Sequence, residues 1–300
     1  MVNDVLKKND RETKIFIFLM LMPAMILLLL FVVVPLLIGL YTSLFMTNGF
    51  ELTKFIGLDN YKFSFSDKVF LSSIWNTLYF AIAVTVAKNV AALLLANMLM
   101  KSGPGTTFFR TSIFIPVTFS FIVTGVLWSW IYNPVFGILN EALKFVGLES
   151  LIRPWLSDPS YALNSIIFVD IWKWTGFHLV IYMAGLIKIP QELYESADID
   201  GANSWEKFVH ITVPQLNMVI VLNVLLAFTG GFINNYDLIK VMTDGGPFNS
   251  TEVALSYIVK TLMKFVNIGK ASAMTIILVI IVAVFGLIQL KVMTRKESND

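Results

Sequence analysis

Six long apolar segments are the feature that most constrains how this chain can fold. Crossing the hydrocarbon core of a membrane takes about 20 residues in a helix, and each segment is long enough. They are Ile15–Tyr41, Ile74–Met100, Phe108–Tyr132, Leu163–Ile187, Ile211–Ile233 and Ile268–Leu290. Lipid offers no hydrogen-bond partner to bare backbone, so single segments of this kind span only as helices. The sequence therefore predicts an all-α, polytopic membrane protein with six transmembrane helices.

The composition agrees with a membrane protein and argues against several other classes. Of the 300 residues, 57% are hydrophobic and 14% are charged, whereas soluble domains carry about 25% charged residues. The chain has no Cys and only two His, so disulfides, thiolate chemistry and a metal site are not expected. A net charge of +2 gives no reason to expect a nucleic-acid partner.

The orientation of the chain follows from its basic residues. The first apolar segment is too long for a signal peptide and no small-residue cleavage site closes it, so it is expected to remain as a span. Lys101, Arg110, Lys188 and Lys207 lie in short segments at span ends, where basic residues favour the cytoplasm most strongly. An even number of spans then puts both termini in the cytoplasm.

Polar residues inside the spans are costly and therefore informative. Lys88 and Asn89 lie midway along the second segment, where a structural role is preferred, either a contact with a partner subunit or a cytoplasmic cavity. Asp170 and Lys173 are three residues apart and are expected to pair on one helix face. Three prolines inside apolar segments are expected to kink them: Pro23, Pro35 and Pro116.

A stretch between the fourth and fifth apolar segments has a different, acidic character. Pro190 suits the start of a short helix, and Gly201 is placed to end that helix with a positive φ. Asn203 and Glu206 have the spacing of a capping box, which predicts a second short helix. Pro214 then interrupts the entry to the fifth apolar segment. The sequence therefore predicts a compact helix–turn–helix at the membrane surface.

This stretch resembles the EAA loop of ABC importer permeases, whose pattern is E-A-A-x3-G-x9-I-x-L-P. Ser196 stands where the pattern has its first Ala, and Val213 stands where it has Leu. The resemblance implies that the loop, residues 190–214, docks on a separate ATPase and transmits its closure. The residues that would carry this coupling are Glu195, Ala197, Asp198, Gly201, Ile211 and Pro214.

Further stretches resemble the carbohydrate-uptake permeases of the maltose and glycerol-phosphate type. They are Phe55–Tyr61, Asn76-Thr77, Phe109-Arg110 with Pro116, Leu186–Pro190, Asp200–Ala202, Thr243–Pro247 with Thr251, and Gly269 with Ala271–Ala273. The Gly-Gly-Pro stretch is typical of the first of the two permeases. The resemblance implies a MetI-like permease core at residues 72–294, preceded by a cytoplasmic terminus, first helix and outer loop at 1–71. Residues 295–300 would form a cytoplasmic tail.

The resemblance also implies the partners, the cargo and a location in the plasma (inner) membrane of a bacterium or archaeon. The partners would be a second sugar permease, an ABC ATPase dimer, an extracellular sugar-binding protein and membrane lipid. No phosphate loop of the form G-x-x-x-x-G-K-[ST] occurs, so ATP and Mg²⁺ are expected on the ATPase, and no cofactor or catalysis on this chain. The resemblance implies a sugar as cargo, an oligosaccharide above all. Phe232 stands where the related maltose permease has an amide, so the identity of that permease's cargo does not carry over to this chain. Five positions match its cargo contacts. They are Trp174, Phe177, Phe232, Asn234 and Asn235.

Alternatives remain open from the sequence alone. The two adjacent Asn residues would serve equally well for helix capping or a hydrogen bond between helices. Another cargo, such as glycerol phosphate, would favour a buried Arg, and Arg110 stands only at a span end. An ion-coupled carrier would call for inverted repeats or membrane carboxylates, and Asp170 is the only acidic residue well inside a span. A membrane enzyme lacks a nucleophile–base set.

Overall fold

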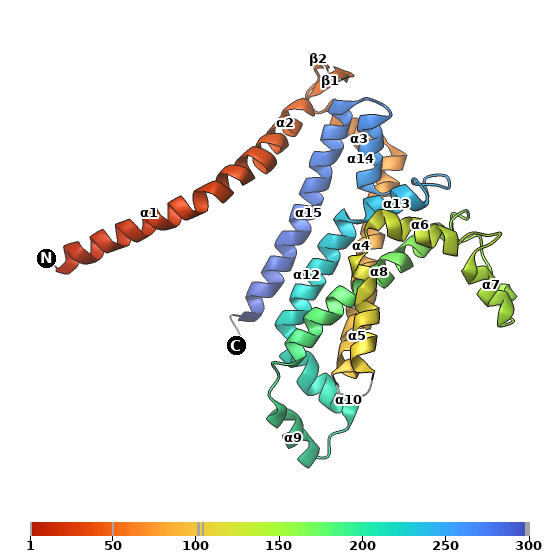
Figure 1. Ribbon diagram of the computed structural model, residues 1–300. Coiled ribbons are helices and arrows are strands. Elements are labelled where there is room, and N and C mark those ends of the chain that lie inside the picture. The colour runs from red at the N-terminus through yellow and green to blue at the C-terminus, as the bar shows by residue number, and fades with distance from the viewer. Residues whose placement is uncertain (1, 50, 101–102, 104, 298–300) are drawn as a thin grey trace. The chain divides into compact units, whose positions relative to one another are not determined.

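The computed structural model describes residues 2–49, 51–100, 103 and 105–297, and for 2–12, 289–290 and 292–297 it describes only the backbone (Figure 1). The predicted tail at 295–300 and the turn around Lys101 lie partly outside the described residues. The chain divides into two units. One contains Met1–Ser66 and Lys260–Ile280, and the other contains Asp67–Val259 and Ile281–Asp300.

The first unit is built on a long apolar helix and a small hairpin. Helix α1 (Val2–Leu28) continues through a π turn, η1 (Leu29–Val33), into α2 (Val34–Thr42). Its span, Thr13–Thr42, has no buried residue in its most apolar window, as expected of a helix that faces lipid. Pro35 is the second residue after the π turn, so the irregularity has a local cause.

The hairpin was not predicted, and it explains one of the sequence motifs. Strands β1 (Phe45–Asn48) and β2 (Glu51–Phe55) pair antiparallel and lead into α3 (Asp59–Ser66). Asn60 donates to the carbonyls of Ser43 and Phe45, at 2.8 and 2.9 Å. Its neighbour Tyr61 shares a 2.7 Å hydrogen bond with the Ser43 hydroxyl. The stretch Phe55–Tyr61 therefore anchors the hairpin to the end of α2.

The second unit has a core of three packed helices. They are α4 (Lys68–Leu99), α8 (Ala162–Leu186) and α12 (Asn217–Ile233). Asp67 caps α4 by accepting hydrogen bonds from the amides of Val69 and Phe70. Small residues let the helices approach closely, since a Cβ added to Gly231 of α12 would lie 2.9 Å from the Cα of Ala81 on α4.

Four of the six predicted spans are continuous helices in the structure, and the other two are broken by a bend. Unbroken spans cover Thr13–Thr42, Lys68–Leu99, Ala162–Leu186 and Ile268–Ile288, within the long helix α15 (Ile268–Glu297). The predicted third span is instead a pair of segments that meet at 106°, and the predicted fifth span is a pair that meets at 74°. The described chain therefore has four continuous spans, or six if each bent pair counts as one.

The break in the third segment has an evident local cause. Helix α5 (Thr106–Phe114) passes into a 3-10 turn, η2 (Ile115–Thr118), that contains Pro116. Phe119 is extended, and Ser120 then caps α6 (Phe121–Ile131) through the amide of Val123. The kink predicted at Pro116 is thus a full change of direction.

Short elements complete the second unit. They are α7 (Ile138–Phe145), η3 (Glu149–Leu151), α9 (Gln191–Ile199), α10 (Ser204–Lys207), η4 (Phe208–Thr212), α11 (Val213–Gln215) and α13 (Asn235–Met242). The fifth apolar segment begins as a continuous helix only at Asn217, because the chain bends between α11 and α12. Helix α14 (Ala254–Met263) runs from the second unit into the first.

Candidate functional site

The acidic stretch folds into the predicted helix–turn–helix, which we call the knob (residues 190–214). Helix α9 ends at Ile199, and Gly201, two residues later, has a φ of +81°, which a residue with a side chain would resist. The backbone N–H of Asn203 donates to Glu206 Oε2 at 2.7 Å, and the backbone N–H of Glu206 donates to Asn203 Oδ1 at 3.0 Å. This is the predicted capping box, and it starts α10.

Two side-chain contacts hold the knob together. Lys207 Nζ on α10 lies 2.6 Å from Asp198 Oδ1 on α9. The hydroxyls of Tyr194 on α9 and Thr212 on η4 share a 2.9 Å hydrogen bond. These contacts fix α9 relative to the chain that leads into α12. The contacts of Tyr194, Lys207 and Thr212 were not predicted from the sequence, because the separations of these residues do not follow the period of any one helix.

The predicted coupling residues occupy different places on the knob. Ala197, Gly201 and Ile211 line one hollow of about 460 Å³. Asp198 lines another hollow of about 570 Å³. Glu195 is exposed on α9, where Gln191 donates a 3.0 Å hydrogen bond to its Oε1, and Pro214 is exposed at the start of α11. The knob also exposes large apolar side chains, with Ile199 88% and Trp205 67% exposed.

A polar network lies between α4 and α8 inside the second unit. Lys88 on α4 forms an ion pair with Asp170 on α8, and both side chains are almost completely buried. The predicted pairing of Asp170 with Lys173 is therefore wrong. A contact of Lys88 with a partner subunit is also ruled out as its role, because its ammonium is buried inside its own chain.

Two further polar pairs extend this network to α12. Tyr182 on α8 donates to Asn89 Oδ1 on α4 at 2.6 Å. His178 Nδ1 on α8 lies 2.8 Å from Asn223 Oδ1 on α12. The network therefore crosslinks the three core helices at depth, where hydrogen bonds between helices replace those that lipid cannot offer.

Lys173 stabilises the break in the third segment. Its Nζ donates to the carbonyls of Pro116 and Val117, both at 3.3 Å, and to that of Phe119. Carbonyls at a helix end have no partner within the helix, and a cation is favourable there. Gly176, one turn further along α8, permits this approach, since a Cβ there would lie 2.2 Å from the carbonyl oxygen of Ile113.

The candidate cargo residues fall into two aromatic clusters and a pair of amides. Trp174 contacts Phe177 and Phe121, with ring centroids 5.7 and 6.0 Å apart. Phe232 is buried against Phe228 and Phe285, on α12 and α15. The ring contacts of the described residues thus place Phe232 in a different cluster from Trp174 and Phe177.

The two Asn residues occupy the junction of α12 and α13. Asn234 is half-buried and stands between the last residue of α12 and the first of α13, where its side chain makes no capping hydrogen bond to α13. Asn235 is completely buried, and its Nδ2 donates to the Gly231 carbonyl at 2.9 Å. Its Oδ1 has no hydrogen-bond partner among the described residues. A buried acceptor without a partner is costly, which keeps Asn235 a candidate for an external hydrogen-bond donor.

The Gly-Gly-Pro stretch is tied to the start of α4. Asn76 donates to the carbonyls of Ser250 and Glu252, at 3.1 and 2.9 Å. Thr77 Oγ1 accepts from the Ala254 amide at 2.9 Å. The motif Asn76-Thr77 therefore positions the loop that follows α13.

The same end of the unit holds a partly buried phenol. Tyr257 donates to Asp67 Oδ2 at 2.9 Å. Burial, reinforced by this carboxylate, raises the pKa of Tyr257 to about 12, so the hydroxyl keeps its proton at neutral pH.

Comparison with known proteins agrees with this architecture. The family model described as "Binding-protein-dependent transport system inner membrane component" matches residues 88–296. A probable ABC transporter permease protein of Bacillus subtilis (strain 168) is 37% identical over 96% of this chain and 99% of its own length. The lactose transport system permease protein LacF of Rhizobium radiobacter is 33% identical, over 89% of this chain and 90% of its own length.

A solved structure shows the same fold. A chain of a bacterial ABC transporter involved in the import of the acidic polysaccharide alginate superposes with a TM-score of 0.82 at 24% identity, covering 96% of this chain and 98% of its own. The predicted MetI-like permease core is thereby confirmed. By its match over residues 88–296 and its likeness to these permeases along nearly the whole chain, the protein belongs to the inner-membrane components of binding-protein-dependent ABC transport systems.

Proposed function

We propose that this chain is the permease subunit of an ATP-driven importer for a sugar, an oligosaccharide above all. It would form the translocation pathway together with a second permease and receive its cargo from an extracellular binding protein. ATP would be hydrolysed on a separate ATPase dimer, which couples to this chain through the knob. The membership in the family of binding-protein-dependent permeases supports this assignment, and the named cargo of a relative, lactose, supports the sugar.

The knob is the observation that carries the coupling proposal. Its two helices are joined by the Lys207–Asp198 ion pair and the Tyr194–Thr212 hydrogen bond, so a push on α9 reaches α12 without the knob first deforming. Glu195 projects a carboxylate on the exposed side of α9, where a basic group of the ATPase would meet it. Closure of the ATPase dimer would then move α9 and rock the core helices between inward- and outward-facing states.

The cargo proposal rests on a buried amide just beyond the end of α12 and on aromatic side chains of α8. Sugars bind through hydrogen bonds and by stacking on aromatic faces. Asn235 holds a buried acceptor without a partner, and Trp174 and Phe177 supply aromatic faces on α8. The pathway would be completed by the second permease, with Phe232 and Asn234 supporting the junction of α12 and α13.

A charge reversal tests the coupling. In the assembled complex, Glu195→Lys should abolish the stimulation of ATPase activity by cargo-loaded binding protein, while membrane insertion and complex assembly stay intact. Glu192→Lys is the matched control, since Glu192 is also exposed on α9 but lies outside the EAA pattern. Normal stimulation in Glu195→Lys, or equal loss in both variants, would count against the role of Glu195.

A truncation of the amide tests the cargo site. Asn235→Ala should lower uptake of the labelled oligosaccharide by about tenfold, the cost of roughly one to two lost hydrogen bonds, without disturbing assembly. Uptake assays with glycerol 3-phosphate in the same cells distinguish a sugar importer from one for a phosphorylated cargo. Unchanged uptake in Asn235→Ala would remove this residue from the cargo site.

A further inference from the structure

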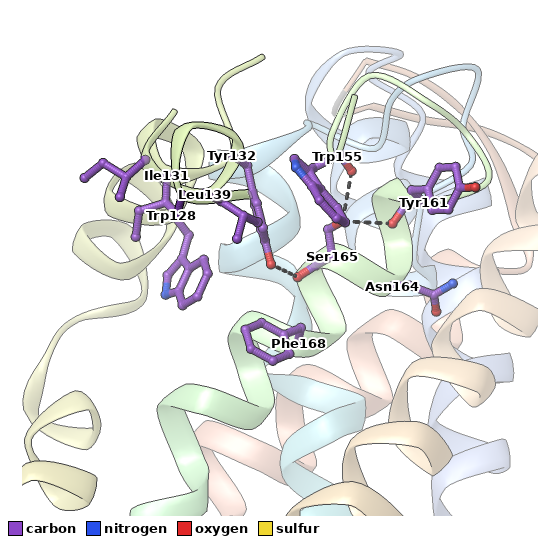
Figure 2. Close-up of a pocket in the computed structure, with 11 residues that line it drawn as sticks. Trp128, Ile131, Tyr132, Leu139, Trp155, Tyr161, Asn164, Ser165 and Phe168 are labelled. Atoms are coloured by element: carbon purple, nitrogen blue, oxygen red, sulfur yellow. Dashed lines mark hydrogen bonds between the residues drawn. The ribbon is translucent and has the colours of Figure 1, made fainter. Parts of the chain in front are cut away.

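One side-chain cavity of the second unit is lined by no residue of the knob and by none of the candidate cargo residues. It has a volume of about 560 Å³, which falls within the range of small-molecule sites, about 300–1,000 Å³. Its walls come from α6, α7, the connection before α8 and the first turns of α8 (Figure 2). The lining residues are Trp128, Ile131, Tyr132, Ile138, Leu139, Ala142, Trp155, Tyr161, Asn164, Ser165 and Phe168.

The cavity has almost no free polar group to offer. The Tyr132 hydroxyl donates to the Ser165 carbonyl at 3.2 Å, and the Ser165 hydroxyl is engaged with the Trp155 and Tyr161 carbonyls, as the dashed lines in Figure 2 show. Asn164 Oδ1 accepts from Tyr79 at 2.8 Å. A sugar needs many hydrogen bonds, and these groups are already used. The lining therefore favours an apolar occupant.

One buried donor remains. The indole Nε1 of Trp128 is buried and has no hydrogen-bond partner among the described residues. The ring itself packs against Tyr132 and Phe168, with centroids 5.2 and 5.5 Å apart, so its orientation is held by packing. A buried N–H without a partner is costly unless a ligand supplies an acceptor. The occupant should thus be apolar and carry at least one carbonyl or similar acceptor.

A cation stands beside the same cavity. The guanidinium of Arg153 lies 5.7 Å from the ring centroid of Tyr161, one of the lining residues. One of its nitrogens donates to the Ile152 carbonyl, and a guanidinium has further donors with a geometry suited to phosphate. The charge next to the cavity is therefore complementary to an anionic head group.

The position of the cavity matches the edge of a membrane. Its α8 residues, Asn164 to Phe168, belong to the first turns of a spanning helix, which is the level of the lipid head groups. Trp and Tyr concentrate at that level in membrane proteins. Helix α7 beside it exposes large apolar side chains, with Ile138 72% and Phe145 92% exposed, as in helices that lie in a lipid surface.

We propose that this cavity binds one acyl chain of an anionic membrane phospholipid, with the phosphate at Arg153 and an ester carbonyl at Trp128 Nε1. The apolar walls take the chain, the indole satisfies one acceptor, and the guanidinium selects the head group. Helix α7 rests on the adjacent lipid with its exposed apolar side chains. This site is separate from the proposed ATPase and sugar contacts.

Lipid retention tests the proposal on the full chain, purified with its transporter subunits in mild detergent and analysed by native mass spectrometry. The wild type should retain one phosphatidylglycerol after delipidation and reloading. Ala142→Trp fills the cavity and should lower the retained fraction by about tenfold, because several methylenes lose their burial. Val146→Trp, on the exposed side beyond α7, is the matched control and should retain the lipid as the wild type does.

A second variant tests the selectivity for the lipid head group independently of the cavity. Arg153→Gln should remove the preference for phosphatidylglycerol over phosphatidylcholine while the acyl chain still binds. Retention in Ala142→Trp equal to the wild type would overturn the proposal. So would an Ala142→Trp variant that keeps its lipid but no longer docks the extracellular binding protein, because the cavity would then belong to a protein partner.

Discussion

The partners of Lys88 and Lys173 lie on other helices or turns, so the spacing of residues along one helix did not predict them. The spacing of Asp170 and Lys173 is correct for a pair on one helix face, yet each of these residues finds a different partner. Asp170 turns to Lys88 on α4, and Lys173 reaches the carbonyls at the break between η2 and α6. Those carbonyls lack hydrogen-bond partners within a helix only because the third segment is broken. The partner of Lys173 therefore was not predictable without the break.

The ion pair of Lys88 and Asp170 leads to a stability prediction. Lys88→Met leaves the Asp170 carboxylate buried without its cation and should destabilise the chain by about 3–5 kcal/mol. The double variant Lys88→Met with Asp170→Leu removes both charges and should recover most of that loss. Thermal unfolding of the detergent-solubilised complex measures both. A Lys88→Met variant as stable as the wild type would contradict the prediction.

Lys173 supports the break, so its removal should have a local effect. Lys173→Met keeps the length of the side chain but removes the donor to the Pro116 and Val117 carbonyls. Hydrogen bonds to charged groups are worth about 1.5–3 kcal/mol, and the variant should lose about that much stability. Hydrogen exchange should increase at α5 and η2. Lys188→Met, at an exposed position beyond the end of α8, is the control and should change neither quantity.

At the scale of elements, the apolar runs and turn signals predicted most of what is found. Four spans agree within a few residues, and the knob has the predicted turn and capping box. These features depend on local sequence, which explains the success. The bends of 106° and 74° depend on which neighbours receive the exposed backbone groups. The hairpin was missed because its strands are short and mostly exposed, without a clear alternation.

The turn of the knob permits a comparison between two glycines with nearly the same backbone strain. Gly201 has φ +81° and Gly147 has φ +75°, and nothing lies within 4 Å of a Cβ added to either. Each Gly→Ala change should therefore cost about 1–2 kcal/mol through the left-handed backbone alone. Only Gly201→Ala should reduce the stimulation of ATPase activity by cargo-loaded binding protein, because only that turn sets the angle of α9.

The outcome of this comparison separates strain from coupling. Equal loss of stimulation in Gly201→Ala and Gly147→Ala would mean that general destabilisation explains the defect. Full stimulation in Gly201→Ala would mean that the turn does not control coupling. Thermal unfolding of both variants confirms that the strain is matched.

For the whole molecule, family and fold were predictable, whereas the site residues remain a prediction. Glu195 and Gly201 belong to a local motif whose shape the structure reproduces. The cargo candidates were carried over by position, and the second permease that would complete their surroundings is a separate chain. The bounds 1–71, 72–294 and 295–300 likewise stay predictions. The polar network of α4, α8 and α12 lies within this single chain, and of its members the sequence indicated only Lys88, Asn89 and Asp170.

The coupling role of the knob depends on the predicted orientation of the whole chain across the membrane. Because the sequence has no Cys, single introduced Cys residues can test that orientation. Ile199 on the knob is 88% exposed and Phe248 in the loop after α13 is 91% exposed, so a Cys at either position is accessible. In intact cells, a membrane-impermeant maleimide should label Phe248→Cys and leave Ile199→Cys unlabelled until the cells are permeabilised. Transport by each variant is the control for folding. Labelling of Ile199→Cys from outside would put the knob beyond the reach of a cytoplasmic ATPase, and the coupling role of Glu195 would fall with it.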